Sequence, residues 1–395
     1  MRKEQEAMYD AVIVGAGFSG AVTARLLAEK FGKQVLLLEQ RRHIGGNMYE
    51  AADSQGIRSH QYGPHIFHTN LPSVFSFLQR FSSFFPYEHR VLGRIDGKLV
   101  PIPFNFTSLE QLYPAEQAAV LKEKLLAAYP GQGKISILDL LANSDPALHA
   151  LGEYVYDRVF VHYTAKQWQQ PIEEVDSSVI NRVPVVLGYD GRYFQDAIQQ
   201  MPSEGYTVLF QRMLEHPRIH VQLSCSALSR LTLQEETGRI LLDGAPFPGP
   251  VVYTGAPDEL LGCRFGPLPY RSLEFVFEQH AVTSYQPAAV VNYPNEEEFT
   301  RITESKKLTG QQAEGRTTIL KEYPAPYQPG ASRGSLPYYP IPNKENQALY
   351  QRYRQALARF PSLHLCGRLA EYRYCNMDAA VASAMALAEA LGQGG

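Results

Sequence analysis

Residues 9–20 read YDAVIVGAGFSG, and this stretch decides the fold. Its apolar half predicts a short buried strand, which leads straight into a GxGxxG turn. Helical periodicity follows to Phe31, and residues 34–38 predict a second strand that ends at Glu39. A strand, a glycine-rich turn, a helix, a strand and an acid in this order are the fingerprint of a dinucleotide-binding βαβ unit.

The residues of the turn suit a bound pyrophosphate. We expect Gly15 to permit the tight turn, Gly17 to let the backbone approach the phosphates, and Gly20 to let the helix pack closely on the strand. The phosphates would lie at the helix N-terminus, beside Phe18 and Ser19, where N–H groups lack partners. Glu39 is the expected acceptor for a ribose hydroxyl.

The second strand continues into an unusual tail. Residues 39–47 read EQRRHIGGN, an acid followed by a basic pair and two glycines. Such a tail suits a second close approach of the backbone to a dinucleotide, at Gln40, Gly46 and Asn47. It resembles flavoproteins of the glutathione reductase and amine oxidase type, so the expected cofactor is FAD.

The composition is that of a globular protein. The chain has 395 residues, a formal net charge of −3, 45% hydrophobic and 19% charged residues, which predicts two or three domains with a large core. The charge balance gives no case for nucleic acid or for an anionic membrane surface. The four cysteines have no CxxC spacing, and no apolar run approaches the ~20 residues of a membrane span. We therefore expect a cytoplasmic protein without membrane insertion.

The remaining sequence predicts an α/β fold with two insertions. An Asp-Gly turn in residues 92–106 predicts a hairpin, residues 108–129 and 137–163 have helical periodicity with Ser108 and Ser136 as caps, and residues 251–322 show short alternating strands. Three units are expected: a discontinuous Rossmann-like FAD-binding domain (8–80, 206–262 and 362–395), a helical substrate domain (108–175) with a mobile loop (174–186), and an antiparallel β-sheet domain (85–107, 187–205 and 263–345).

Three histidines within nine residues raise the question of a metal. His60, His65 and His68 lie in SHQYGPHIFHTN, residues 59–70. In an extended segment the side chains of His65 and His68 point to opposite faces, and no cysteine lies nearby, so the ligand set of a zinc or iron site is missing. We expect no metal.

Arginine and aromatic residues gather in three further stretches, at 159–168 with Arg182, at 293–304 with 321–324, and at 367–374. Arginine binds a diphosphate through paired donors, and aromatic faces stack on flat bases such as uracil. Taken singly, each of these residues could equally be a core aromatic or a solvated arginine.

Together these motifs resemble the bacterial UDP-galactopyranose mutases. The resemblance runs from about residue 9 to residue 390. The segments that carry it are VIVGAGFSGAV (12–22), EQRRHIGGN (39–47), HQYGPHIFHTN (60–70), YTAKQW (163–168), NRVPV (181–185), TRITE (300–304), KEYP (321–324), PYYPI (337–341) and GRLAEYRYCNMD (367–378).

The resemblance implies an isomerase that interconverts UDP-galactopyranose and UDP-galactofuranose for surface polysaccharide. In this family reduced FAD is the nucleophile: its N5 attacks the anomeric carbon, UDP leaves, and an iminium adduct lets the sugar ring open and reclose. NADPH or NADH is the expected external reductant and a homodimer the expected assembly. No carboxylate pair in these stretches suits glycosyl transfer by side chains, which agrees with a cofactor nucleophile.

The resemblance also implies roles for individual residues. Those expected to act in catalysis are Arg301, Arg182, His65 and Arg368. Those expected to bind FAD are Gly15, Gly17, Phe18, Ser19, Gly20, Glu39, Gln40, Gly46, Asn47, His65, Ile66, Arg368, Cys375, Asn376, Met377, Asp378, Ala379 and Ala380. Those expected to bind substrate are His89, Phe160, Tyr163, Trp168, Arg182, Tyr193, Arg301, Tyr323 and Tyr374. His60 and His68 are expected to be supporting or structural residues.

Two positions depart from the family pattern and leave the sugar open. Cys375 stands where a second tyrosine is usual, and His89 stands where some members carry asparagine near the sugar. The substrate is therefore galactose or a 2-substituted relative. Two other functions are weighed: an FAD-dependent oxidoreductase of the amine oxidase or desaturase type, and a flavin or nucleotide-sugar binding module without turnover.

Overall fold

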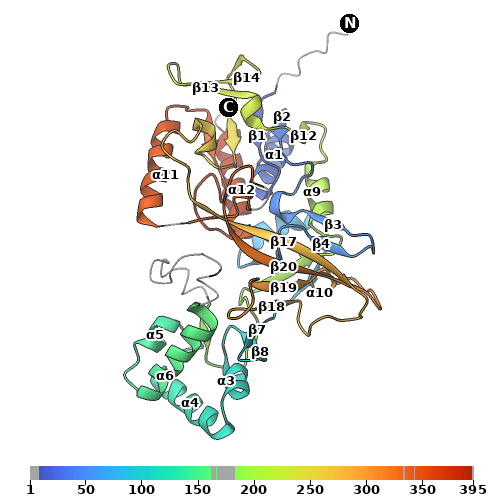
Figure 1. Ribbon diagram of the computed structural model, residues 1–395. Coiled ribbons are helices and arrows are strands. Elements are labelled where there is room, and N and C mark those ends of the chain that lie inside the picture. Colours follow the sequence, from blue (N-terminus) through green and yellow to red (C-terminus); the bar gives the residue numbers. More distant parts are fainter. Residues whose placement is uncertain (1–8, 162–165, 167–182, 332–333, 342, 394–395) are drawn as a thin grey trace.

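The computed structural model describes residues 9–161, 166, 183–331, 334–341 and 343–393. Three regions follow one another along the molecule in Figure 1. A parallel sheet with its helices occupies one end, a long twisted sheet the middle, and a group of helices the other end.

The end region is built on a five-stranded sheet in which every neighbouring pair is parallel, in the order β12-β2-β1-β16-β22. Its strands are β1 (Ala11–Val14), β2 (Val35–Leu38), β12 (Ile219–Gln222), β16 (Val251–Tyr253) and β22 (Leu363–Leu365). The predicted βαβ fingerprint is confirmed, because β1 and β2 pair directly and α1 (Phe18–Phe31) connects them. The strands of this sheet therefore come from three separate parts of the sequence.

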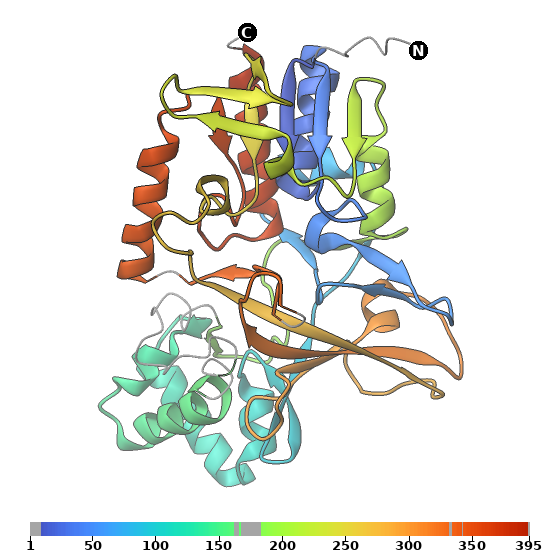
Figure 2. The ribbon, with the colours of Figure 1, turned by 45° about the horizontal axis from the view of Figure 1, so that its top comes forward.

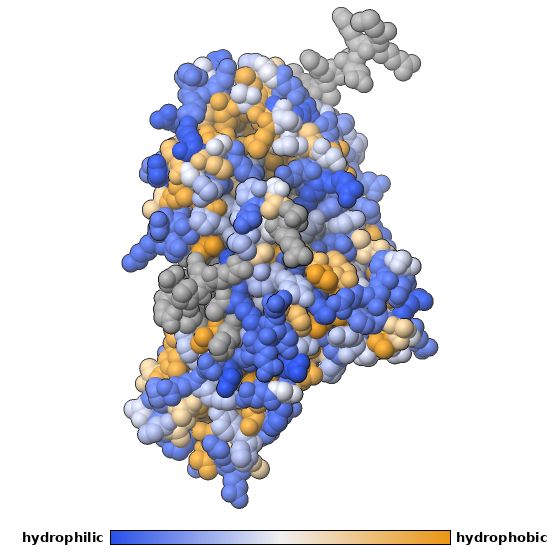
Figure 3. All heavy atoms as spheres, viewed as in Figure 1, coloured by the Kyte–Doolittle hydropathy of each residue, from blue (hydrophilic) through white to orange (hydrophobic). Residues whose placement is uncertain are grey.

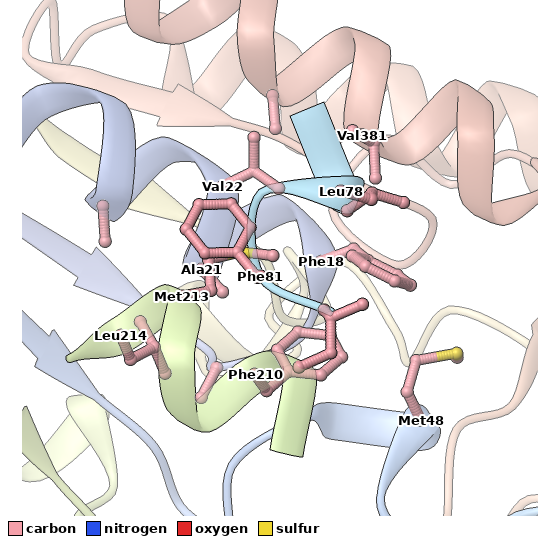
Figure 4. Close-up of a cluster of buried hydrophobic side chains, with 14 of the residues drawn as sticks. Phe18, Ala21, Val22, Met48, Leu78, Phe81, Phe210, Met213, Leu214 and Val381 are labelled. Carbon is pink, nitrogen blue, oxygen red and sulfur yellow. The ribbon is translucent and has the colours of Figure 1, made fainter. Parts of the chain in front are cut away.

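Both faces of this sheet are covered at its centre, so the three central strands β1, β2 and β16 are buried along their length. Ile13 and Leu37 face a core formed with α1, α9 (Tyr206–Leu214) and α12 (Met377–Gln393). Figure 4 shows how side chains of these helices converge on one another. Val12 and Leu36 face the other way, onto a small antiparallel sheet of β13 (Leu231–Gln234), β14 (Arg239–Leu242) and β15 (Ala245–Phe247).

The middle region is a seven-stranded sheet in the order β21-β17-β20-β19-β18-β7-β8. Its strands are β7 (Val91–Ile95), β8 (Lys98–Ile102), β17 (Tyr270–His280), β18 (Val290–Asn292), β19 (Arg301–Glu304), β20 (Thr317–Pro326) and β21 (Tyr339–Pro340). Neighbouring strands pair antiparallel, as expected, except β18 and β7, which pair in parallel. The chain leaves this sheet after β8 and returns after a long excursion, which frees β18 to enter in the same direction as β7.

The predicted hairpin is confirmed. β7 and β8 pair antiparallel across the Asp96-Gly97 turn. Asp96 has φ 48° and Gly97 has φ 77°, as a two-residue hairpin turn with two left-handed positions requires.

The helical region holds α3 (Phe106–Leu112), α4 (Ala115–Ala128), α5 (Ile137–Leu141), α6 (Pro146–Val155) and a π-helix at Tyr156–Val161. The two long helices predicted from periodicity are each divided, at Pro114 and at Asp145-Pro146, because proline lacks the N–H that a continuous helix needs. The predicted cap Ser136 is confirmed. The predicted cap Ser108 is wrong: Asn105 is the N-cap of α3, and Ser108 completes its capping box three residues later.

A small antiparallel sheet joins the end and middle regions, in the order β5-β11-β6. It contains β5 (Phe67–Thr69), β6 (Phe84–Pro86) and β11 (Ile198–Pro202), with His68 opposite Gln199. β5 belongs to the segment assigned from sequence to the FAD-binding domain and β11 to that of the sheet domain. Main-chain hydrogen bonds thus tie these segments together, while the domain boundaries themselves stay a prediction. Figure 2 gives a second view of the three regions.

Hydrophilic residues cover most of the face drawn in Figure 3, with small groups of hydrophobic residues between them. Among the residues that the structure describes, no helix has the length and apolar character needed to cross a membrane.

The fold makes Gly20 sensitive to substitution. A Cβ atom at this position would overlap the carbonyl oxygen of Gly15, which is backbone and cannot move aside. We expect Gly20→Ala to lower the free energy of unfolding by about 3 kcal/mol, measured by urea denaturation. Gly133→Ala is the matched control, because its Cβ would meet open space; equal stability losses in both variants would contradict the packing argument.

Candidate active site

The glycine turn has the geometry expected from its sequence. Gly15 has φ 99°, a left-handed conformation that favours glycine, and its N–H donates to the Leu38 carbonyl at 2.8 Å. α1 begins at Phe18, so the N–H groups of its first turn point past the end of β1. The turn also meets the second glycine pair, because Gly46 lies backbone to backbone against Gly17.

Glu39 holds this turn in place. Its carboxylate is buried, and its two oxygens accept hydrogen bonds of 2.8 Å from the backbone N–H groups of Ala16 and Arg41. An ionised carboxylate has further lone pairs for a ribose hydroxyl. The acid therefore organises the loop in addition to the ligand role predicted for it.

A cavity of about 690 Å³ opens beside the turn and extends into the middle region. Most of the predicted site residues line it: Gly15, Gly17, Phe18, Ser19, Glu39, Gln40, Gly46, Asn47, His65, Ile66, His89, Phe160, Tyr193, Arg301, Arg368, Tyr374, Cys375, Asn376, Met377 and Ala380. The two groups predicted separately for cofactor and substrate thus share one cavity.

Four predicted residues do not line this cavity: Gly20, Tyr323, Asp378 and Ala379. Gly20 packs against the turn, Asp378 accepts a hydrogen bond from Thr69 at 2.9 Å, and the ring of Tyr323 lies edge-on to Phe299. Tyr163, Trp168 and Arg182, with residues 174–182 of the predicted loop, lie outside the described residues.

The three closely spaced histidines contact different partners. Nε2 of His60 lies 2.8 Å from Oε1 of the buried Glu50, and its Nδ1 accepts a 3.1 Å hydrogen bond from the backbone N–H of His65. Nδ1 of His65 contacts the Gly63 carbonyl at 2.8 Å, and Nδ1 of His68 lies 2.8 Å from Asp196. Within the described ranges no group of three or more His, Cys, Asp or Glu side chains could hold a metal ion.

Two cavity histidines are neutral near pH 7. Burial lowers the pKa of His65 to about 3, and burial likewise lowers the pKa of His89 to about 3. Arg301 adds to both shifts, since a nearby positive charge disfavours the imidazolium. A neutral imidazole can offer one N–H donor and one acceptor to a sugar hydroxyl.

Arg301 lies beside a buried carboxylate. It is paired with Glu322 across β19 and β20, and its Nε lies 3.4 Å from Oε2 of Glu322. The Glu322 side chain is 2% exposed; burial raises its pKa, whereas Arg301 opposes that rise. The pair fixes the base of the Arg301 side chain, which projects toward the cavity.

A second arginine lies among aromatic rings. The guanidinium of Arg368 is 4.8 Å from the ring centre of Tyr339 and 5.2 Å from that of Tyr338. Tyr339 in turn stacks on Tyr374 at 5.4 Å. Arg301 and Arg368 are thus two of the cationic residues of the cavity, and Arg368 lies against an aromatic part of its wall.

Comparison with known proteins identifies the family. A family model described as UDP-galactopyranose mutase matches residues 158–374, and one described as an NAD(P)-binding Rossmann-like domain matches residues 13–81. The UDP-galactopyranose mutase of Mycoplasma pneumoniae is 37% identical over 97% of this chain and 96% of its own. The chain belongs to the UDP-galactopyranose mutase family.

Two further comparisons delimit this result. The dTDP-fucopyranose mutase of Escherichia coli is 34% identical over 97% of this chain and 98% of its own. A crystal structure of reduced UDP-galactopyranose mutase superposes with a TM-score of 0.74, over 98% of this chain and 94% of that one, at 17% identity, and so supports the fold. The relatives from Mycoplasma pneumoniae and Escherichia coli, each at least 34% identical over nearly the whole chain, are mutases, which favours an isomerase over the oxidoreductase alternative.

The family and its Rossmann-like domain support a flavin cofactor, and the described residues fit one. The turn beneath α1 offers backbone N–H groups to a pyrophosphate. Nη1 of Arg41 is buried without a hydrogen-bond partner, and Arg41 lines the cavity, as suits an anionic ligand. Arg41 was not among the predicted site residues, although the basic pair of residues 41–42 was the signal for it.

Two more features of the site escaped the sequence analysis. Glu322 lies within the KEYP stretch, but strand alternation places it, and not Tyr323, beside Arg301. Asn292 lines the cavity at the end of β18, and its Oδ1 is buried without a partner. An asparagine within an apolar strand is unusual, and that was its only signal.

The low pKa of His89 has a consequence for stability. In the unfolded chain a histidine has a pKa of 6.5. Between pH 6.5 and about 3, His89 is therefore protonated in the unfolded state but not in the folded state. The free energy of unfolding should therefore fall with decreasing pH in this window, by about 1.4 kcal/mol per pH unit for each such histidine.

His89→Asn tests this origin. Asparagine does not titrate, so the variant should lose less stability than the wild type between pH 6 and pH 4. The slope of the free energy of unfolding against pH should be smaller in the variant by the contribution of about one proton. Urea denaturation across that range measures it. Parallel slopes for the two proteins would mean that His89 titrates normally in the folded state.

Proposed function

We propose that this protein interconverts UDP-galactopyranose and UDP-galactofuranose while holding reduced FAD. The observation that carries the proposal is the continuous cavity that joins the glycine turn to Arg301 and Tyr374. Membership of the mutase family over nearly the whole chain supports the same reaction. A nucleotide sugar bound in this cavity would lie directly beside a flavin on the turn.

The cavity residues suit an anionic nucleotide sugar. Arg301 and Arg368 would bind the diphosphate and the sugar end through charged, paired donors. The neutral imidazoles of His65 and His89, together with Asn292, would hydrogen-bond the sugar without adding charge. Tyr193 and Tyr374 would flank the diphosphate, and Phe160 the base.

Residues outside the described ranges complete the proposal. Tyr163 and Trp168 would stack with the uracil, and Arg182 would close over the diphosphate. FAD, when bound in its reduced form, supplies the nucleophilic nitrogen for the anomeric carbon. The side chains bind and orient the sugar, exclude water and hold hydroxyl protons in place.

The assembly and surroundings are also part of the proposal. A homodimer in the cytoplasm, reduced by NADPH or NADH, agrees with the sequence resemblance. The product would serve the synthesis of surface polysaccharide.

The names of the relatives differ in the nucleotide and in the sugar of the substrate. One relative is a dTDP-fucopyranose mutase, so a deoxysugar on another nucleotide is the second substrate to test. The reaction class is the same in both cases. Discrimination depends on the base and on the sugar hydroxyls that meet residues such as His89.

An anaerobic assay tests the function directly. Purified holoprotein, with and without dithionite, is incubated with UDP-galactofuranose or dTDP-fucofuranose, and products are separated by chromatography. We expect UDP-galactofuranose to give a pyranose product with the dithionite-reduced protein and no product with the oxidised protein. Oxidation of an amine without any pyranose product would favour the oxidoreductase instead, and UDP binding without turnover in either redox state a binding module.

Arg301→Ala separates binding of the two ligands. Removing the guanidinium should lower kcat/KM by about 100-fold or more, because a charge-assisted donor pair to the diphosphate is lost. Flavin absorbance should remain, since the glycine turn is untouched. Arg212→Ala is the control, as Arg212 pairs with Glu204 at 2.6 Å on the surface; full activity in Arg301→Ala would remove this residue from the site.

A further inference from the structure

His68 and Asp196 form an imidazole–carboxylate pair on the cavity wall. Nδ1 of His68 lies 2.8 Å from Oδ2 of Asp196. The other carboxylate oxygen accepts a 2.7 Å hydrogen bond from Nδ2 of Asn70. Asn70 is itself held by the backbone N–H of Ala197 at 2.9 Å. Both oxygens of Asp196 are therefore fixed, and the carboxylate in turn orients the imidazole.

This arrangement determines which nitrogen of His68 is available. A carboxylate only accepts hydrogen bonds, so Nδ1 carries the proton that is shared with Asp196. The ring lies flat on Phe194, with centroids 3.6 Å apart and planes 14° apart. Among the described residues none hydrogen-bonds Nε2, and the side chain is 11% exposed. Nε2 is thus the open edge of the ring at the cavity.

The other cavity histidines lack this combination. Nδ1 of His65 contacts a backbone carbonyl, and its Nε2 lies 3.5 Å from the hydroxyl of Tyr338. Nδ1 of His89 is buried without a partner. Within the described part of the cavity, His68 is the histidine that has both a carboxylate partner and an open nitrogen. That combination is the usual design of a side chain that gives and takes protons.

The proposed reaction requires one hydrogen to change oxygen atoms. A galactopyranose ring closes through O5 and leaves O4 as a hydroxyl, whereas a galactofuranose ring closes through O4 and leaves O5 as a hydroxyl. Each forward turnover therefore places a proton on O5 and removes one from O4. One group that performs both transfers returns to its starting state.

We propose that His68 carries this proton, with Asp196 as its positioning residue; the assignment rests on the proposed function. As the C1–O5 bond breaks, its electron pair stays on O5, and Nε2–H of the imidazolium gives its proton to O5. As O4 forms its bond to C1, the O4–H bond breaks and that proton passes to Nε2.

The transfers balance within the molecule. His68 returns to its starting state at the end of each turnover, so no external acid, base or redox partner is consumed. The reverse reaction exchanges the roles of O4 and O5. Asp196 stabilises the ring while it carries both protons, before the first transfer and after the second, and the electron demand at C1 is met by the cofactor chemistry stated above.

The test uses the reduced holoenzyme and the variants His68→Asn and Asp196→Asn. The second variant keeps the size of the side chain but removes the charge that holds the imidazolium. Three quantities are measured: the rate of UDP-galactofuranose isomerisation, the migration of a heavy-oxygen label between bridging and non-bridging positions of the diphosphate, and the Kd of UDP by calorimetry. Label migration reports cleavage of the anomeric bond to UDP and needs no proton on O4 or O5.

We expect isomerisation to fall by about 100-fold or more in both variants, with label migration, UDP affinity and flavin absorbance as in the wild type. Unchanged isomerisation overturns the assignment. A parallel loss of label migration and UDP affinity also overturns it, because His68 would then serve binding or folding. Wild-type protein that isomerises neither substrate overturns the proposed function, and this assignment with it.

His280→Asn is the matched control. Nε2 of His280 lies 3.3 Å from Glu278 on β17, away from the cavity, so the variant removes a comparable imidazole–carboxylate pair. Its isomerisation rate should equal that of the wild type. An equal loss in this control would overturn the specific role of His68.

Discussion

The close approach of α1 to the turn after β1 is the constraint on which the site depends. Gly20 has no room for a side chain, so the helix begins where its first N–H groups face the ends of the parallel strands. Glu39, at the end of the neighbouring strand, holds the same turn from the other side. Ligands of open parallel sheets bind at these strand ends, and the cavity extends from this point into the middle region.

Charge in the cavity is distributed in a way that suits a dianionic ligand. Arg301, Arg368 and Arg41 are among the residues that supply positive charge, while burial keeps His65 and His89 neutral. Glu322, whose side chain is buried, anchors Arg301. The result is a cationic centre with neutral hydrogen-bonding groups around it, so that anionic and uncharged parts of one substrate meet different walls.

Local features of the fold could be predicted from sequence because their causes are local. The βαβ unit and the Asp96-Gly97 hairpin follow from adjacent residues. The cap of α3 was misplaced because Asn105 and Ser108 both qualify, and the chain direction before the helix decides between them. The parallel pairing of β18 with β7 and the position of Glu322 beside Arg301 depend on contacts between segments far apart in the chain, which a sequence pattern does not contain. The contact of His68 with Asp196 is of the same kind, since the two residues are distant in sequence.

The strand order of the parallel sheet has a consequence for biosynthesis. The cofactor region needs β1 from the start of the chain, but also β22 and α12, which end at residues 365 and 393. A ribosome must therefore deliver the chain as far as α12 before this region can close. A cofactor held by this region would then be bound late, and a product that ends before β22 would lack part of the sheet that holds it.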